Sequence, residues 1–211
     1  RDIDEKAPEP KADEEQKLYQ VPKPTVLPFN ELAEVPANSE VEANAFQLGN
    51  LLFKGKRATV TSATFTQFET EVAIKQFGSK EMLQIELDAL KTTLPHPNVI
   101  RYYGSNLNEH FIVLERLCLG LGSHCQDRMW QSPFPAVAEP VELLHGICSG
   151  LTHCHSKKVV HRNLTIDNIH LRSTGTGFEA VINDFGVSGV LGNTTAPRRG
   201  SLRHYAPEAV T

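Results

Sequence analysis

The sequence predicts an α+β fold of two lobes, with a ligand site in the cleft between them. Two observations predict this class. Residues 46–117 carry alternating and β-branched segments typical of strands, interrupted by one helical pattern. After residue 138 the pattern turns helical, and two short strands follow. We therefore expect a β-rich N-terminal lobe over 46–117 and a helical C-terminal lobe over 118–211.

Residues 1–45 differ from the rest of the chain. They hold six of the 13 prolines, many charges and little apolar periodicity. A segment of this kind buries too little apolar surface to offset its ordering entropy, so we expect a disordered linker. It is not a signal peptide, because its first 15 residues are charged where an apolar core would be needed.

Composition limits the partners and the compartment. The chain has 211 residues, 40% of them hydrophobic, and a net charge of −4. This charge argues against nucleic acid as a partner, since phosphate binding needs a basic face. Four cysteines without a CxxC pair favour reduced thiols and a cytoplasmic location. The most apolar run, residues 111–122, contains Glu115 and Arg116 and is too short to span a membrane.

The elements follow in order. Strands are expected at 58–65, 70–77 and 110–117, and later at 168–172 and 180–184. A helix is expected over 79–94, ended by the sequence PHPN, with a second helix over 139–156. The predicted apolar face of the first helix is Met82, Ile85, Leu87, Leu90 and Leu94, and that of the second is Val141, Leu144, Ile147, Cys148 and Leu151.

Five short motifs occur in a fixed order: VAIK with Lys75, a helix with Glu86, HRNLTIDN at 161–168, NDFG with Asp184, and YAPE at 205–208. Phosphoryl transfer needs a cation for the nucleotide phosphates, oxygen ligands for metal ions, and a base for the acceptor. With these motifs on the elements that this chemistry requires, residues 46–211 resemble the protein kinases. The resemblance implies a bilobal protein-kinase-like fold that binds ATP and Mg²⁺.

The resemblance also implies residue roles. Lys75 would bind the phosphates and be held by Glu86, while Asn168 and Asp184 would bind Mg²⁺. Arg162 would pair with a phosphate in the activation segment, for which Ser201 after Arg198 and Arg199 is a candidate, although exposed arginine pairs are common. The remaining nucleotide-binding positions would be Gly55, Val60, Ala73, Glu115, Leu117 and His170.

Within the kinases, three segments resemble the endoplasmic-reticulum stress-sensor kinase–ribonucleases and ribonuclease L. They are 96–104, 139–156 and the long connection 172–180. This branch implies a place on the cytosolic face of the endoplasmic reticulum, a protein partner or self-dimer, and a membrane link only through upstream sequence. The chain ends three residues after Glu208, so we expect an incomplete C-terminal lobe and assign no ribonuclease activity.

Four positions depart from the kinase pattern. Asn163 stands where the catalytic loop carries its Asp base, and Thr165 replaces the lysine that steadies the γ-phosphate. The glycine-rich loop, 53–60, keeps only Gly55 and Val60. His170 replaces the usual leucine beneath the adenine. An amide cannot accept a proton, and losing a positioned base typically costs about 10²–10⁴-fold in rate.

The sequence therefore predicts a pseudokinase: a nucleotide-binding module that acts on a partner or on its own dimer through its conformation. Two alternatives stay open, namely a Ser/Thr kinase that tolerates Asn163 in the full-length protein and a structural relic that binds no nucleotide. The cluster of His145, Cys148, His153, Cys154 and His155 also raises a zinc hypothesis, but its spacing favours ordinary helix packing.

Overall fold

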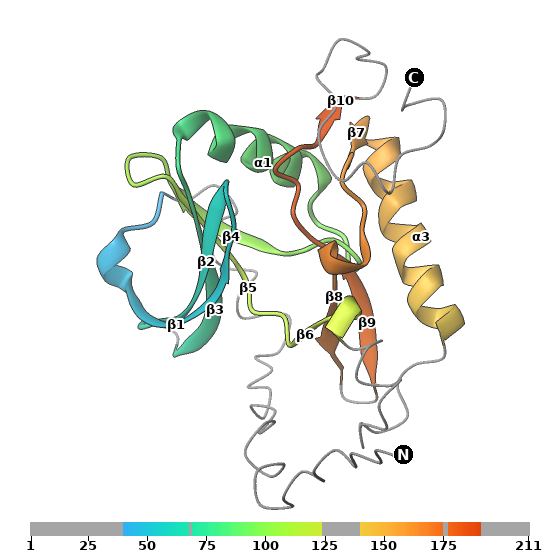
Figure 1. The fold of residues 1–211 in the computed structure, drawn as a ribbon, viewed down its shortest axis with the longest axis horizontal. Coiled ribbons are helices and arrows are strands. Elements are labelled where there is room, and N and C mark those ends of the chain that lie inside the picture. Colours follow the sequence, from blue (N-terminus) through green and yellow to red (C-terminus); the bar gives the residue numbers. More distant parts are fainter. Residues whose placement is uncertain (1–39, 68, 124–139, 175–176, 191–211) are drawn as a thin grey trace, which may run out of the picture.

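The computed structural model describes residues 40–67, 69–123, 140–174 and 177–190, and the prediction of a disordered linker lies outside these ranges up to residue 39. Figure 1 shows a sheet with α1 beside it, and a second group of strands flanked by α3. The elements are η3 (Ala43–Ala45), β1 (Phe46–Lys54), β2 (Ala58–Phe65), β3 (Thr70–Phe77), α1 (Lys80–Thr93), β4 (Tyr102–Asn106), β5 (Phe111–Glu115), β6 (Leu119–Gly120), α3 (Pro140–Ser156), β7 (Val159–Val160), η4 (Ile166–Asn168), β8 (Ile169–Ser173), β9 (Phe178–Ile182) and β10 (Gly189–Val190).

The N-terminal lobe contains a five-stranded sheet in the order β1-β2-β3-β5-β4, in which all neighbouring strands are antiparallel. The strands predicted from alternation and the first helix are confirmed within one or two residues at most ends. Ser79 caps α1 by accepting a hydrogen bond from the Met82 N–H at 3.4 Å. On one face of the sheet, Phe46, Phe65 and Phe111 form the centre of an apolar cluster that is separate from the main core. The other face packs into the main core together with α1.

The predicted face of α1 was only partly right. Leu87 and Leu90 are buried as expected, whereas Met82, Ile85 and Leu94 are only partly buried. The fully buried positions include Leu83 and Glu86. Glu86 is buried because α1 directs its carboxylate toward Lys75 of the sheet. A hydrophobic periodicity could not anticipate a buried carboxylate at the centre of the packed face.

Ordered contacts begin before residue 46, where the N-terminal lobe was expected to start. Val41 is buried, its N–H donates to the Ser105 carbonyl at 3.1 Å, and its carbonyl accepts from Asn106 Nδ2 at 3.0 Å. Glu40 and Val41 therefore pair with β4, and Ala45 packs against the apolar cluster around Phe46, so ordered contacts precede the expected start of the lobe at residue 46.

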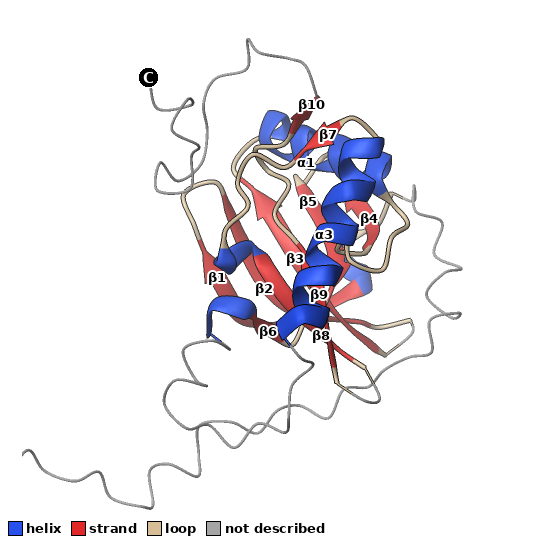
Figure 2. Ribbon diagram, turned by 90° about the vertical axis from the view of Figure 1, so that its right-hand side faces the viewer, coloured by secondary structure: helices blue, strands red, loops and turns tan. Residues whose placement is uncertain are grey.

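In the C-terminal lobe, α3 lies along β9, as the two views in Figures 1 and 2 show. Gly146 and Gly150, one helical turn apart, allow the close approach. A Cβ at Gly146 would come within 2.8 Å of Asn98 Nδ2, and one at Gly150 within 2.8 Å of the Asn98 carbonyl oxygen. Any side chain at these two positions would push α3 away from the loop that contains Asn98.

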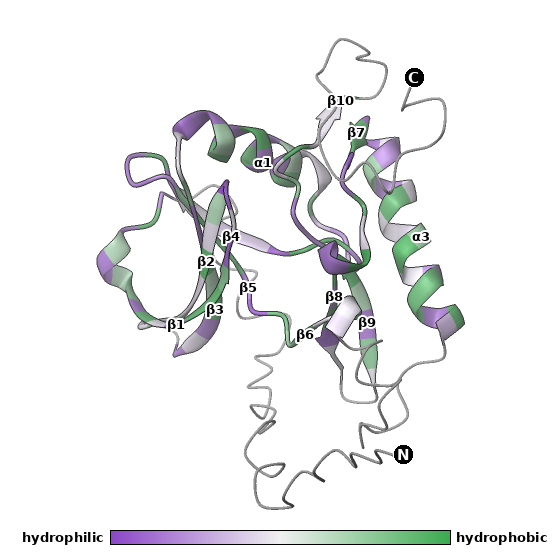
Figure 3. Cartoon of the chain, viewed as in Figure 1, coloured by the Kyte–Doolittle hydropathy of each residue, from purple (hydrophilic) through white to green (hydrophobic). Residues whose placement is uncertain are grey.

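The apolar face predicted for α3 was only partly right. Ile147 and Leu151 pack against the core as expected, whereas Val141 is 72% exposed and Leu144 is 60% exposed. The buried positions are Leu143, Gly146, Gly150 and Cys154. Apolar residues occur on more than one side of this helix (Figure 3), so periodicity alone did not determine which side is buried. Close backbone approach, which small residues permit, decided the packing instead.

The two lobes meet through backbone and side-chain contacts. Ile182 of β9 exchanges backbone hydrogen bonds with the segment after α1: its N–H donates to the Asn98 carbonyl, and its carbonyl accepts from the Ile100 N–H, both at 2.9 Å. Arg172 of β8 binds both carboxylate oxygens of Glu115 at the end of β5, at 2.9 and 2.5 Å. In the described part of the chain, no helix is long and apolar enough to cross a membrane.

Candidate active site

The centre of the candidate site is a buried ion-pair cluster of Lys75, Glu86 and Asp184. The Lys75 ammonium lies 2.8 and 2.6 Å from the two oxygens of Glu86 and 2.6 Å from Asp184 Oδ1. These groups come from β3, α1 and the segment after β9, so both lobes contribute. Glu86 is fully buried, whereas the Asp184 side chain is 38% exposed. The predicted Lys75–Glu86 pair is therefore present, and Asp184 joins it from the cleft side.

Burial and charge act in opposite directions in this cluster. Burial by itself would lower the pKa of Lys75, but Glu86 and Asp184 together outweigh it and the pKa lies above its usual value. Burial would raise the pKa of Asp184, and Lys75 reverses this, so that the pKa lies below its usual value. Burial raises the pKa of Glu86, and Lys75 only partly offsets it. Lys75 thus stays a cation at neutral pH and keeps Asp184 ionised.

His161 connects the catalytic loop, residues 161–168, to the segment that follows β9. Its Nδ1 accepts from the Asn163 N–H at 3.3 Å and its Nε2 lies 2.9 Å from the Asn183 carbonyl. Its ring meets the buried Phe185 edge-on, with centroids 4.8 Å apart. These contacts join the loop to the strand end that carries Asp184.

Two residues of the site have strained backbones. Arg162 has a φ of 63° and Asp184 a φ of 65°, in the left-handed region that costs a non-glycine residue about 1–3 kcal/mol. The Arg162 guanidinium lies against Gly189, where an added Cβ would collide with it. Its predicted phosphate partner, Ser201, lies outside the described residues, as do Arg198, Arg199 and the YAPE motif.

Asn163 and Asn168 are neighbours in the loop. The Asn168 side-chain N–H₂ donates to the Asn163 carbonyl at 2.8 Å, which leaves Asn168 Oδ1 as the acceptor end of that amide. Asn168 also accepts a backbone hydrogen bond from Asn183, the residue before Asp184. An amide oxygen and a carboxylate are the hard oxygen ligands that Mg²⁺ takes, so the residues present fit the predicted metal.

The base-binding positions lie around the main core. Ala73 and Leu117 are buried in it, and Val60 packs against it. His170 lies on β8 opposite Gly120 of β6, its pKa is lowered by burial, and its Nδ1 is buried without a hydrogen-bond partner. An orphaned polar atom of this kind is unfavourable in the core and is tolerated more readily beside a ligand site.

Glu115, predicted to bind the nucleotide, has its N–H bonded to the Arg101 carbonyl at 3.0 Å and its side chain bound elsewhere. Its carboxylate is bound by Arg172 and accepts the Arg101 N–H at 2.9 Å, so the side chain is engaged between the lobes. Arg172 also reaches the carbonyl of Pro97 and the carboxylate of Glu179. Burial would lower the pKa of Arg172, and Glu115 raises it above its usual value.

The glycine-rich loop is a tight turn between β1 and β2. The Gly55 N–H donates to the Ala58 carbonyl at 3.0 Å. A Cβ at Gly55 would come within 2.7 Å of Phe53 Cε1, so the phenyl ring lies against this glycine. The one glycine that the loop retains is therefore partly covered, and its N–H is used within the turn.

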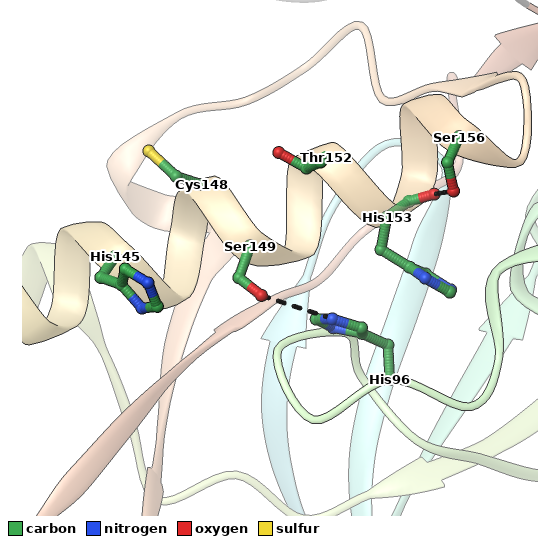
Figure 4. A pocket seen from close by; sticks show the side chains of 7 residues that line it. All are labelled: His96, His145, Cys148, Ser149, Thr152, His153 and Ser156. Carbon is green, nitrogen blue, oxygen red and sulfur yellow. Dashed lines mark hydrogen bonds between the residues drawn. The ribbon is translucent and has the colours of Figure 1, made fainter.

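The histidines and cysteine of the zinc hypothesis have other partners or positions. A surface groove of about 560 Å³ is lined by His96, His145, Cys148, Ser149, Thr152, His153 and Ser156 (Figure 4). His153 Nε2 lies 2.8 Å from the Thr93 carbonyl and its ring stacks on His96, while Cys154 is buried in the core. In the described ranges no three His, Cys, Asp or Glu residues are placed to hold a metal ion.

Sequence reasoning missed Arg172 and Asn183. Asn183 Oδ1 accepts the Asp184 N–H at 2.8 Å and so helps fix the strained backbone of Asp184. A polar side chain directly before DFG was the available signal. For Arg172 the signal was the arginine beside the apolar residues of a short strand, but its partner is 57 residues away.

Comparison with known proteins agrees with this geometry. Residues 46–211 match the protein kinase domain family. The serine/threonine-protein kinase dst4 of Dictyostelium discoideum is 27% identical over 174 residues, 79% of this chain and 35% of the relative. Myosin light chain kinase A of the same organism is 28% identical over 185 residues, 82% and 60% of the two chains. The sensor for unfolded proteins in the ER, ire1, of Schizosaccharomyces pombe is 29% identical over 160 residues, 68% and 15% of the two chains.

The Lys75–Glu86 pair and the two-lobed fold are those of a protein kinase domain. The chain belongs to the protein kinase family. It spans between 15% and 60% of the length of these three relatives. Members of this family bind ATP with Mg²⁺ in the cleft where Lys75, Asn168 and Asp184 lie.

Proposed function

We propose that the chain is a pseudokinase domain, which binds a magnesium nucleotide but transfers phosphate poorly. The observation that carries this proposal is the intact Lys75–Glu86–Asp184 cluster beside Asn163. Lys75 holds the phosphates, Asp184 and Asn168 hold the metal, and the metal neutralises phosphate charge when it is bound. The conformation of the two lobes then depends on the nucleotide.

The catalytic loop supports the second half of the proposal. Asn163 carries an amide, which orients a hydroxyl without accepting its proton, and Thr165 supplies no cation. The catalytic loop also carries a carboxylate, Asp167. It is exposed on η4, and its Oδ1 lies beside Gly122. This position directs Asp167 toward the segment after β6, so it is not a replacement base for Asn163.

The second candidate function is an active Ser/Thr kinase. The assembled Lys75–Glu86 pair favours it, because this pair must be in place for transfer. The left-handed backbone of Asp184 also favours it, because strained backbone conformations of this kind cluster at active sites. We place it second because no described group replaces the base, and a positioned base contributes about 10²–10⁴-fold.

We also propose a place for the domain among the stress-sensor kinases, at the cytosolic face of the endoplasmic reticulum, with a protein partner or a second copy. The likeness to the sensor for unfolded proteins supports this. It is a proposal about the branch, because other kinases match with similar identity.

Thermal unfolding with and without Mg²⁺–ATP tests nucleotide binding. A ligand that binds only the folded state stabilises it by about 2.7 kcal/mol at a hundredfold excess over Kd. We expect a rise in Tm for the wild type and none for Lys75→Met, which removes the phosphate cation. Lys75→Met/Glu86→Gln removes the fully buried Glu86 charge together with the lysine, leaves only the partly exposed Asp184 carboxylate, and should also show no rise. Lys91→Met, at an exposed lysine of α1, is the matched control and should respond like the wild type. Equal shifts in wild type and both Lys75 variants would contradict the proposed site.

A further inference from the structure

Exposed apolar side chains are concentrated on the outer strand of the N-terminal sheet. Of the eight large apolar residues that are exposed in the described ranges, four lie on β1, namely Leu48, Leu51, Leu52 and Phe53. Strand β1 stands at one end of the five-stranded order, with β2 as its neighbour in that sheet (Figure 2). Grouped apolar side chains on a surface are typical of contact sites for proteins or membranes.

The register of the sheet places Leu48, Leu51 and Lys54 in one row along this edge. Their partners on β2 are Ala63, Thr61 and Thr59, which lie opposite Val72, Ile74 and Gln76 of β3. Alternate residues of β3 share a face, and directly opposed residues project from the same face. Leu48 is 66% exposed and Leu51 is 59% exposed, and Lys54 is exposed as well. The row is therefore apolar along the strand and cationic at its end.

The charge at this edge is positive. Strands β1 and β2 contain no acidic residue, and the one acidic residue of β3, Glu71, lies on the opposite face because it pairs with Thr64. Lys54 ends β1, and Lys56 and Arg57 follow in the turn. A lysine keeps its ammonium among polar groups while its stem lies on apolar surface. Apolar side chains beside cations suit the interface of an anionic lipid layer.

The backbone of β1 argues against an added peptide strand at this edge. Its register with β2 shifts between Leu48 and Leu51 and again between Leu51 and Phe53. An added strand needs a regular row of backbone groups, and bulges of this kind protect sheet edges from pairing. Phe53, opposite Val60 and 62% exposed, projects from the other face of the strand. Apolar side chains thus flank the edge on both faces, and a lipid surface requires no register.

We propose that the β1 edge, formed by Leu48, Leu51, Phe53, Lys54 and Lys56, is a peripheral contact with an anionic lipid surface. The apolar side chains enter the interfacial layer, and the two lysines lie among the negatively charged headgroups. This contact extends the proposed location at the endoplasmic-reticulum membrane. It does not require a bound nucleotide, so it can be tested apart from nucleotide binding.

Co-sedimentation of the whole chain with vesicles tests this proposal. The probes are vesicles of phosphatidylcholine alone and vesicles that also contain phosphatidylserine. We expect the wild type to bind the anionic vesicles at least about tenfold more strongly, and less strongly at high salt. Lys54→Gln/Lys56→Gln should weaken this binding about tenfold or more, because two cations near the surface are lost. Leu48→Ser/Leu51→Ser should weaken it about fivefold or more, because less apolar surface is buried.

Two matched controls lie elsewhere on the molecule. Lys80→Gln/Lys91→Gln removes two charges from exposed lysines of α1. Val141→Ser/Leu144→Ser removes two apolar side chains of α3 that are 72% and 60% exposed. Both controls should bind the anionic vesicles like the wild type. Circular dichroism of every variant shows that the fold is retained.

Equal binding to neutral and anionic vesicles, no binding by the folded wild type, or equal losses in the β1 variants and the controls would overturn the proposal. Sedimentation velocity without lipid covers the competing occupant. A wild-type dimer that Leu48→Ser/Leu51→Ser dissociates would make this edge a protein interface and the lipid proposal wrong. A failure to bind Mg²⁺–ATP would sink the proposed nucleotide site and leave the vesicle result unchanged, so the two proposals fail separately.

Discussion

At the scale of single residues, Lys75 balances the charge of two carboxylates from different lobes. Glu86 is fully buried and Asp184 is partly exposed, so Glu86 depends on the lysine far more. Breaking a buried ion pair by removing one partner costs about 3–5 kcal/mol, because the other charge is left without a counterion.

This dependence gives a double-mutant prediction. Lys75→Met should lower the free energy of unfolding by several kcal/mol, and Lys75→Met/Glu86→Gln should recover part of that loss, because Gln removes the unpaired charge that is fully buried and leaves only the partly exposed Asp184. Urea unfolding monitored by circular dichroism provides the measurement. Strictly additive losses in the two single variants and the double variant would mean that the pair is not coupled.

The sequence was informative for residues whose motif fixes their chemistry. Lys75, Glu86, Asn168 and Asp184 are placed as the kinase resemblance implied, although their ligand roles stay predictions. The sequence could not show that Glu115 binds Arg172, since the two are joined only after β5 and β8 are placed by the fold. Nor could it show that Phe53 lies on Gly55, which depends on the bulged register of β1 and β2.

At the scale of elements, the end of α1 and the helix α3 are joined by two histidines. His96 and His153 stack with centroids 4.5 Å apart (Figure 4). His96 Nδ1 accepts the Asn98 N–H at 3.1 Å, and its Nε2 lies 3.4 Å from Ser149 Oγ. Burial, followed by the charge of His153, lowers the pKa of His96. A proton on Nδ1 would displace the Asn98 hydrogen bond.

The pH dependence follows from that lowered pKa. Above about pH 6.5 both folded and unfolded chains carry a neutral His96, and the stack is fully present. As the pH falls below this value the unfolded chain binds the proton first, so stability decreases. We expect Tm to fall between about pH 7.5 and 5.5, and to fall less in His96→Gln.

His155→Gln is the control for this experiment, since His155 is an exposed residue of the same helix. It should keep the wild-type slope of Tm against pH. His161 and His170, whose pKa values burial also lowers, should maintain a residual slope in His96→Gln. A slope in His96→Gln equal to that of the wild type would show that the stack does not titrate with folding.

Prediction of elements succeeded where periodicity and local capping agreed. The helix over 80–93 has Ser79 as its cap, and the β-branched run over 70–77 forms the central strand β3. The face of α3 was predicted only in part, at Ile147 and Leu151, because the helix carries apolar residues on more than one side. The choice between these sides came from Gly146 and Gly150, whose lack of side chains lets Asn98 approach.

At the scale of the whole molecule, the two lobes are tied together behind the cleft and meet again at the Lys75 cluster. Arg172 binds Glu115, and Ile182 pairs with the segment after α1, while Asp184 reaches Lys75 from the other lobe. These contacts hold the two lobes in the arrangement in which Lys75 is paired with carboxylates of both. They do not supply a base at Asn163. The proposed pseudokinase rests on these two observations together: the Lys75–Glu86–Asp184 cluster is assembled, and the catalytic loop carries Asn163 and Thr165 in place of the base and the lysine.

Transfer of radiolabelled phosphate from Mg²⁺–ATP to a generic Ser/Thr substrate tests this account most directly, with Lys75→Met as the background. We predict that wild-type turnover is indistinguishable from this background under conditions in which calorimetry shows bound nucleotide. Loss of a base alone would lower the rate about 10²–10⁴-fold, and the neutral Thr165 removes further stabilisation. Wild-type turnover well above that of Lys75→Met would contradict the account and establish the active-kinase alternative.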